Sequence, residues 1–233
     1  MIRILKHLIF IFIGALILSG CSPVYIPNAP FVFNNQQQGD YEVNYRQGAY
    51  SSNLQGGYAI SDNLNLGLAL SSLYSAESSV ASTVYKATKA YDVNIVAGYY
   101  NKFTAKHVFE MNAGVGSVFM SEPQNIKDYY KFYVQPSITF AGTEGRTDTD
   151  FTMLTRLVGT SFRSIEGASD TSVFQGYIEP VLSFSVGNQF RFNTQLGVSL
   201  GLQENYFKHH SPFIFNIGIG YTLPRKREEA ILP

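Results

Sequence analysis

Hydrophobic and polar residues alternate with a period of two along most of the chain from Asp40 onward. Between residues 190 and 203 the even positions are nearly all hydrophobic, and the odd positions carry Arg, Asn, Gln, Gly or Ser. A helix cannot separate these two sets, whereas a β-strand places them on opposite faces. The pattern predicts ten strands, at residues 40–49, 51–60, 63–75, 88–101, 106–120, 127–142, 150–164, 172–186, 189–204 and 212–223.

The connections between the predicted strands alternate between short and long ones. Residues 61–63 and 187–188 are typical of tight turns, whereas residues 76–87 form the longest connection. Transmembrane β-barrels show this alternation, with short periplasmic turns and longer external loops. We therefore expect an all-β fold, a single antiparallel up-and-down transmembrane β-barrel of about ten strands at residues 40–223, with eight strands as the alternative count. An even number of strands places both ends of the barrel on the periplasmic side.

The polar face of the predicted strands indicates what lies inside the barrel. It is rich in Asn, Gln, Ser, Thr and Gly and carries four acids and four bases: Glu42, Arg46, Asp92, Glu110, Lys131, Arg156, Glu179 and Arg191. Because an unpaired charge in a narrow interior is costly, we expect these groups to pair and fill the bore rather than line an open channel. Aromatic residues gather on the apolar face near the strand ends, as they do at the lipid interfaces of a membrane barrel. A soluble lipocalin-like barrel, with its apolar face inward, is the alternative.

Two stretches of similar sequence, Tyr133–Phe140 and Tyr177–Phe184, each carry a proline, at Pro136 and Pro180. A proline removes a backbone donor from a strand, so each one predicts a β-bulge. We assign these prolines no function, because paired barrel strands converge on similar sequences.

The chain begins with the features of an exported lipoprotein. Arg3 and Lys6 precede an apolar run at residues 8–18, which is too short to span a membrane as a helix but suits a signal peptide. The run ends at Leu18-Ser19-Gly20-Cys21, which resembles the lipobox of bacterial lipoproteins. The resemblance implies cleavage before Cys21, a diacylglycerol on its thiol and an acyl group on its new amino terminus. Cys21 is the only cysteine, so no disulfide within the chain uses its thiol.

The sequence therefore divides into a signal peptide at 1–20, a lipidated tether at 21–39, the barrel at 40–223 and a C-terminal tail at 224–233. The mature chain resembles the small outer-membrane β-barrel proteins of Gram-negative bacteria, in pattern rather than through a diagnostic motif. It departs from them where the tail follows the last strand, since such barrels usually end on an aromatic residue. The resemblance implies three partners: outer-membrane lipid, the barrel assembly machinery and the lipoprotein sorting machinery. Ser22 is not the acidic residue that retains some lipoproteins in the inner membrane, so we expect sorting to the outer membrane. The residues after it lack an acidic cluster resembling surface-export signals, so we expect the anchor in the inner leaflet.

Composition and motifs offer little chemistry. Two of the 17 Lys and Arg residues lie in the signal peptide, against 17 Asp and Glu, so no basic excess suggests a nucleic-acid partner. No phosphate-binding glycine loop, zinc-protease helix or Cys-based metal motif is present, so we expect no catalytic residue, no metal ligand and no cofactor. The pair His209 and His210, in the last external loop, is the nearest candidate for the rim site of an outer-membrane protease or lipid-modifying enzyme.

We expect a non-enzymatic protein with a structural or surface-interaction role, carried by the external loops. In such barrels the wall supplies stability and the variable loops supply contacts. The sequence does not identify the surface partner. A narrow channel or ligand-binding barrel is the first alternative, the rim enzyme the second, and a soluble lipocalin-like lipoprotein the third.

Replacement of Cys21 tests the lipobox. We predict that Cys21→Ser abolishes incorporation of radiolabelled palmitate and leaves the precursor uncleaved, because the thiol is the acceptor of the lipid. Palmitate labelling of the Cys21→Ser variant at the wild-type level would contradict the prediction.

Overall fold

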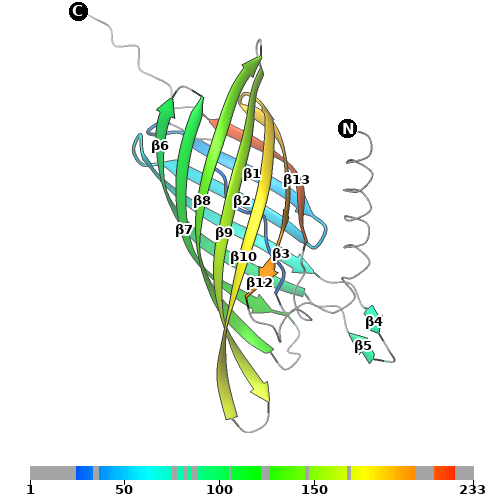
Figure 1. Ribbon diagram of the computed structural model, residues 1–233. Coiled ribbons are helices and arrows are strands. Elements are labelled where there is room, and N and C mark those ends of the chain that lie inside the picture. Colours follow the sequence, from blue (N-terminus) through cyan, green and yellow to red (C-terminus); the bar gives the residue numbers. More distant parts are fainter. Residues whose placement is uncertain are drawn as a thin grey trace, which may run out of the picture.

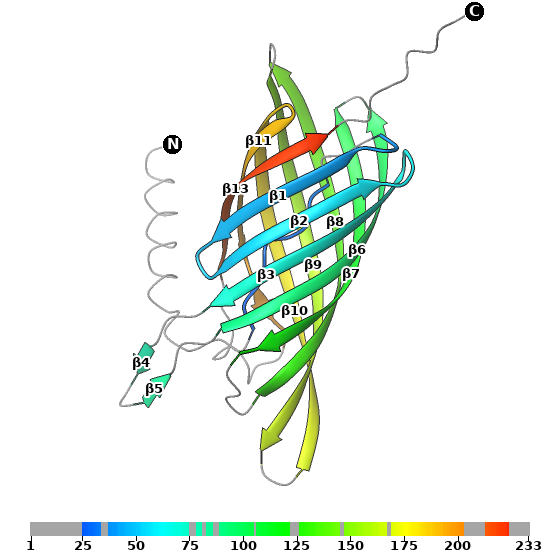
Figure 2. The same ribbon diagram turned by 180° about the vertical axis from the view of Figure 1, so that it is seen from behind.

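The computed structural model describes residues 25–33, 37–74, 78–80, 83–85, 89–104, 106–121, 126–144, 147–166, 169–202 and 213–223. Over these ranges the chain forms a β-barrel with a short extended segment inside it (Figures 1 and 2). The strands of the described ranges are β1 (Tyr41–Gly48), β2 (Ser51–Ala59), β3 (Leu64–Tyr74), β4 (Ser78–Val80), β5 (Thr83–Tyr85), β6 (Lys89–Thr104), β7 (His107–Met120), β8 (Ile126–Glu144), β9 (Thr147–Glu166), β10 (Ser169–Gly187), β11 (Phe190–Val198), β12 (Leu200–Gly201) and β13 (Phe213–Leu223).

The prediction of a ten-stranded antiparallel barrel is confirmed. Each predicted range contains one barrel strand, and the ninth is divided at Ser199 into β11 and β12. The strands follow one another around the barrel in chain order, and β13 pairs with β1 to close it, from Tyr41↔Leu223 to Gly48↔Asn216. A closed barrel has no edge strand, so each strand satisfies its backbone groups on two neighbours.

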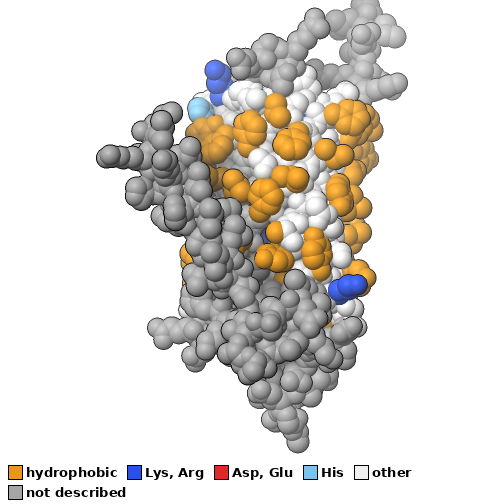
Figure 3. All heavy atoms as spheres, turned by 90° about the vertical axis from the view of Figure 1, so that its right-hand side faces the viewer, with side chains coloured by type: hydrophobic (Ala, Val, Ile, Leu, Met, Phe, Trp, Pro, Cys, Tyr) orange, Lys and Arg blue, Asp and Glu red, His pale blue; other side chains and the backbone are white. Residues whose placement is uncertain are grey.

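The hydrophobic face of the strands points outward. Leu64, Leu66, Leu68 and Leu70 are 42–48% exposed, whereas Asn65 between them is 2% exposed. Figure 3 shows hydrophobic side chains spread over one face of the wall. The arrangement is the reverse of a soluble lipocalin-like barrel, whose apolar face points inward. Within the described ranges, no helix is long and apolar enough to cross a membrane.

Three details of the wall differ from the expectations. β9 and β10 pair as far as Ser169↔Glu166, beyond their predicted ends, so their hairpin extends past the other strands (Figure 1). β4 and β5 form a small separate hairpin within the longest connection. The two expected β-bulges are wrong, because the registers run without a shift past Pro136 and Pro180. A proline costs the ladder one donor, and here the strands lose that bond without inserting a residue.

Residues 25–33 lie inside the barrel, within the stretch that the sequence predicts to be a tether. All nine are buried, and Tyr25 and Phe31 are 1% exposed. The segment begins near the end of the barrel that carries the long connections and the β9–β10 hairpin, which we call the loop end. It leads toward the opposite end, which carries the short turns and where the Gly39 amide donates to the Ala59 carbonyl. Residues 26–33 belong to no strand and show no hydrophobic period, which is why the sequence pattern predicts only a tether.

The closed ladder predicts heat-modifiable migration in electrophoresis. Unheated protein in mild detergent is expected to migrate as a compact band that shifts after boiling, because the barrel unfolds only when its closed hydrogen-bond network is broken. Identical migration of heated and unheated samples, with the β-sheet circular dichroism already lost in detergent, would contradict the closed barrel.

Candidate functional site in the barrel lumen

Residues 25–33, here called the lumen segment, are held by side chains of the barrel wall. Gln55 Nε2 donates to the Ala29 carbonyl over 2.8 Å, and Asn53 Oδ1 accepts the Ala29 amide over 3.1 Å. Farther along, the Pro30 carbonyl accepts hydrogen bonds from Gln195 and Arg46. The Phe31 carbonyl accepts one from Gln135. The Phe33 amide donates one to Glu110. Buried backbone groups require such partners. Pro27 and Pro30 offer no amide donor, which suits a segment that has no neighbouring strand.

Three glycines on the inner face of the wall make room for two aromatic rings of the lumen segment. A Cβ atom on Gly67 would lie 2.5 Å from Phe31 Cζ, and one on Gly57 or Gly98 would lie 2.9 or 2.8 Å from the Phe33 ring. The rings therefore rest against the backbone of β2, β3 and β6, where any larger residue would displace them. Their centroids are 4.4 Å apart, at the short limit of the separations that aromatic pairs favour.

The polar side chains of the segment complete a buried ion pair between β9 and β10. Arg156 Nη2 and Glu179 Oε2 are 2.6 Å apart, and both side chains are at most 2% exposed. Tyr25 donates its hydroxyl to Glu179 Oε1 over 2.9 Å, and Ser199 donates to the same oxygen over 3.0 Å. Arg156 donates to the side-chain oxygen and to the carbonyl of Asn28, over 2.8 and 3.0 Å. A buried ion pair is tolerated when its remaining donors and acceptors are satisfied in this way.

Asn28 also joins this ion pair to a second one. Lys131 pairs with Asp92, and both side chains are at most 3% exposed. The Asn28 amide nitrogen donates to Asp92 Oδ2 over 3.0 Å, while its amide oxygen accepts from Arg156. One side chain of the lumen segment therefore bridges a carboxylate on β6 and a guanidinium on β9.

The other four charges that the sequence places on the polar face also lie on the inner face of the barrel. Glu42, Arg46 and Glu110 are 1–3% exposed, and Arg46 Nε donates to a wall amide, Asn193 Oδ1, over 2.8 Å. Arg191 lies near the short-turn end, where it pairs with Asp150. The sequence analysis missed Asp150, although its even spacing from Arg156 places it on the same face of β9.

Cys21, His209 and His210 lie outside the described residues. Among the residues that are described, no group of three or more His, Cys, Asp or Glu side chains could hold a metal ion.

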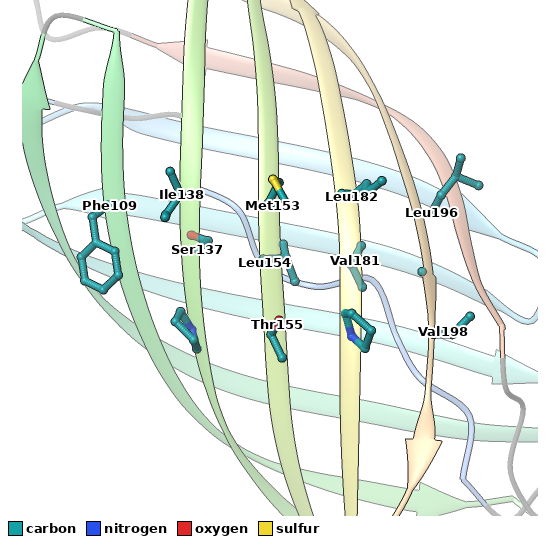
Figure 4. Close-up of a pocket in the computed structure, with 13 residues that line it drawn as sticks. Phe109, Ser137, Ile138, Met153, Leu154, Thr155, Val181, Leu182, Leu196 and Val198 are labelled. Carbon is teal, nitrogen blue, oxygen red and sulfur yellow. The ribbon is translucent and has the colours of Figure 1, made fainter. Parts of the chain in front are cut away.

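A shallow groove of about 490 Å³ lies on the wall across β7 to β11 (Figure 4). Ile138, Met153 and Leu182 line it and are 44–51% exposed, so it opens toward the outside of the barrel. The smaller side chains of Pro136 and Pro180 also line it. A groove with this mostly apolar lining suits lipid acyl chains better than a polar ligand.

Comparisons with known proteins add little to this description. No protein-family model and no curated protein matches the chain. Among solved structures, it is similar to the N-terminal β-barrel domain of Pseudomonas aeruginosa OprF, with 11% identity, a TM-score of 0.34, and coverage of 81% of this chain and 100% of that one. LpxR from Salmonella typhimurium shows 9% identity and a TM-score of 0.41, over 78% and 99% of the two chains. The KdgM porin, solved with disordered oligogalacturonate, shows 9% identity and a TM-score of 0.36, over 79% and 99%. Values this low carry no functional argument.

Neutralising one partner of the Arg156–Glu179 pair should cost more free energy of unfolding than neutralising one partner of the Arg191–Asp150 pair. Glu179→Gln leaves the fully buried Arg156 without a charged partner, so we expect a loss of about 3 kcal/mol in the free energy of unfolding. Asp150→Asn is the matched control, because its ion pair with Arg191 is 10–12% exposed and touches no described residue of the lumen segment. It is expected to cost less than Glu179→Gln, because water reaches both of its side chains.

The measurement is urea unfolding of the barrel in lipid vesicles, followed by circular dichroism because the chain has no tryptophan. Equal losses in the two variants would show that the burial of Arg156 and Glu179 does not govern stability.

Proposed function

We propose that the protein is a lipid-anchored outer-membrane β-barrel that acts as a closed scaffold for its external loops. The observation that carries the proposal is the filled lumen, in which residues 25–33 are buried and bonded to the wall on several sides. A bore that the protein's own chain occupies leaves little room for a path of water or solute. The alternative of a narrow channel is therefore disfavoured.

The outer face supports the placement in a membrane. Its exposed side chains are hydrophobic over the length of the strands, and aromatic ones occur near both ends. Toward the short-turn end these are Tyr99, Phe140 and Phe184; toward the loop end they are Tyr91, Tyr130 and Phe174. Such girdles suit the two interfaces of a bilayer. Together with the lipobox at Cys21, they favour the outer membrane of a Gram-negative cell.

The loop end supports an interaction role. The β9–β10 hairpin extends beyond the other strands there, and the long connection that contains β4 and β5 lies at the same end (Figure 2). A rigid wall that holds such connections in place is a common way to present a binding surface. Four of the buried charges form the ion pairs Lys131–Asp92 and Arg156–Glu179, which Asn28 of the lumen segment joins, so these groups offer no open site for the chemistry of an enzyme.

Conductance across a planar bilayer tests the closed scaffold. We predict that the purified wild-type protein is silent, because the lumen segment occupies the bore. Replacement of residues 25–33 by a flexible Gly–Ser stretch of equal length should produce steady openings, because the polar wall then faces water. Adding Arg156→Glu to that variant should shift the ion selectivity of these openings toward cations, because Arg156 lies in the bore.

Leu68→Ala is the matched control, since Leu68 is on the outer face and its loss should leave the protein silent. Steady openings of the wild-type protein, with a selectivity that Arg156→Glu changes, would contradict the proposal and favour the channel.

A further inference from the structure

Contacts with two strands, β2 and β6, show in which direction the lumen segment runs through the barrel. β2 runs from the loop end toward the short-turn end, and along it Asn53 contacts Ala29 whereas Gly57 lies against Phe33. β6 runs the same way, and along it Asp92 contacts Asn28 whereas Gly98 lies against Phe33. Residue 33 therefore lies nearer the short-turn end than residues 28 and 29 do. The chain enters at the loop end and passes inside the barrel before β1 begins at Tyr41.

Two further contacts, one of the residues after the segment and one of its first residue, agree with this direction. At the short-turn end, the Gln38 amide donates to Asp62 in the β2–β3 turn over 3.0 Å. Toward the loop end, the Tyr25 ring stacks on Tyr177, with centroids 4.1 Å apart. Tyr177 is the partner of Gly201 in β12, and the long connection to β13 follows almost directly.

Chain length then limits where Cys21 can lie. It precedes Tyr25 by four residues, which span at most about 14 Å when fully extended. The apolar band of an outer-membrane barrel is about 25 Å tall. Four residues that start near the loop end cannot return to the opposite interface, and the bore between is filled by Phe31, Phe33 and the ion pairs of Asp92 and Glu179.

We propose that the lipid on Cys21 is held at the loop end, in the outer leaflet of the outer membrane. The chain then crosses the membrane through its own lumen, and its acylated end lies on the cell surface. The inference rests on the proposed function, which supplies the membrane and the lipid. It replaces the expectation of an inner-leaflet anchor, which was drawn only from the lack of an acidic cluster after Cys21.

The loop end offers surroundings suited to acyl chains. Tyr91, Phe119 and Tyr130 lie near that end of their strands and are 47–72% exposed on the outer face. The lumen offers no comparable space, because the apolar side chains of its wall, such as Leu73 and Val118, are already packed against the lumen segment in one buried cluster. Acyl chains at Cys21 can therefore leave water only by turning outward over the rim into the bilayer.

Thiol labelling on intact cells tests the path. Three single variants of the full chain are used: Val24→Cys, next to the lumen segment; Ser121→Cys, exposed at the loop end; and Lys106→Cys, exposed at the short-turn end. The probe is a membrane-impermeant maleimide, applied to intact Gram-negative cells and to permeabilised cells. The native Cys21 thiol is occupied by its lipid, and palmitate labelling of each variant verifies this.

We expect the Val24→Cys variant to react on intact cells, as the Ser121→Cys variant does, and to gain nothing from permeabilisation, while the Lys106→Cys variant reacts only after permeabilisation. Protection of the Val24→Cys variant on intact cells, in parallel with Lys106→Cys, would overturn the inference. Its failure is distinguishable from failure of the proposed function. If the two control variants react equally on intact cells, or with the opposite preference, the barrel does not span the outer membrane as proposed, and the surface anchor falls with it.

Discussion

The structure depends above all on how the polar groups of the lumen are satisfied. A barrel with a hydrophobic outer face must turn its amides and charges into a bore barely wide enough for side chains. Buried polar groups without partners cost free energy, and buried charges cost more. The segment at residues 25–33 supplies carbonyl acceptors to the wall amides, and Asn28 binds both Asp92 and Arg156. The wall and the segment each supply hydrogen-bond partners to the other, so the segment is part of the barrel's interior rather than a linker to it.

This dependence has a consequence for assembly. The segment lies inside a ring that closes only when β13 pairs with β1. Under the proposed lipidation, acyl chains attached to Cys21 before folding could not be drawn through a bore occupied by Phe31, Phe33 and two ion pairs. The proposal therefore requires the segment to lie against the inner faces of β2, β3 and β6 before closure. The glycines at 57, 67 and 98 fit this order. They lie on three consecutive strands of the sheet and leave space against the backbone for the rings of Phe31 and Phe33.

Most of the wall was predictable because alternation is a direct record of the two faces of a strand. Apart from Thr194, the even positions from Phe190 to Leu202 are exposed hydrophobics, as their pattern indicates. All ten strands appear where predicted within a few residues. Strand ends were less predictable. Beyond the bilayer both faces of the β9–β10 hairpin are free to be polar, so the alternation fades while the pairing continues to Ser169↔Glu166. The same fading at the start of β9 concealed Asp150, the partner of Arg191.

The lumen segment could not be predicted from periodicity, since an extended chain with wall on every side has no polar face. Its composition did carry a signal: Tyr25, Ile26, Phe31, Val32 and Phe33 are unsuited to a tether in water. That signal alone cannot separate burial in the lumen from burial against the bilayer. The discriminating information lies on the wall. Inner-face glycines leave space for the aromatic rings, and the inner-face amides of Gln55, Gln135 and Gln195 donate to carbonyls of the segment. A barrel sequence with both features is expected to hold a peptide segment inside the barrel. The candidates for that segment are the apolar residues of the same chain that lie outside its predicted strands.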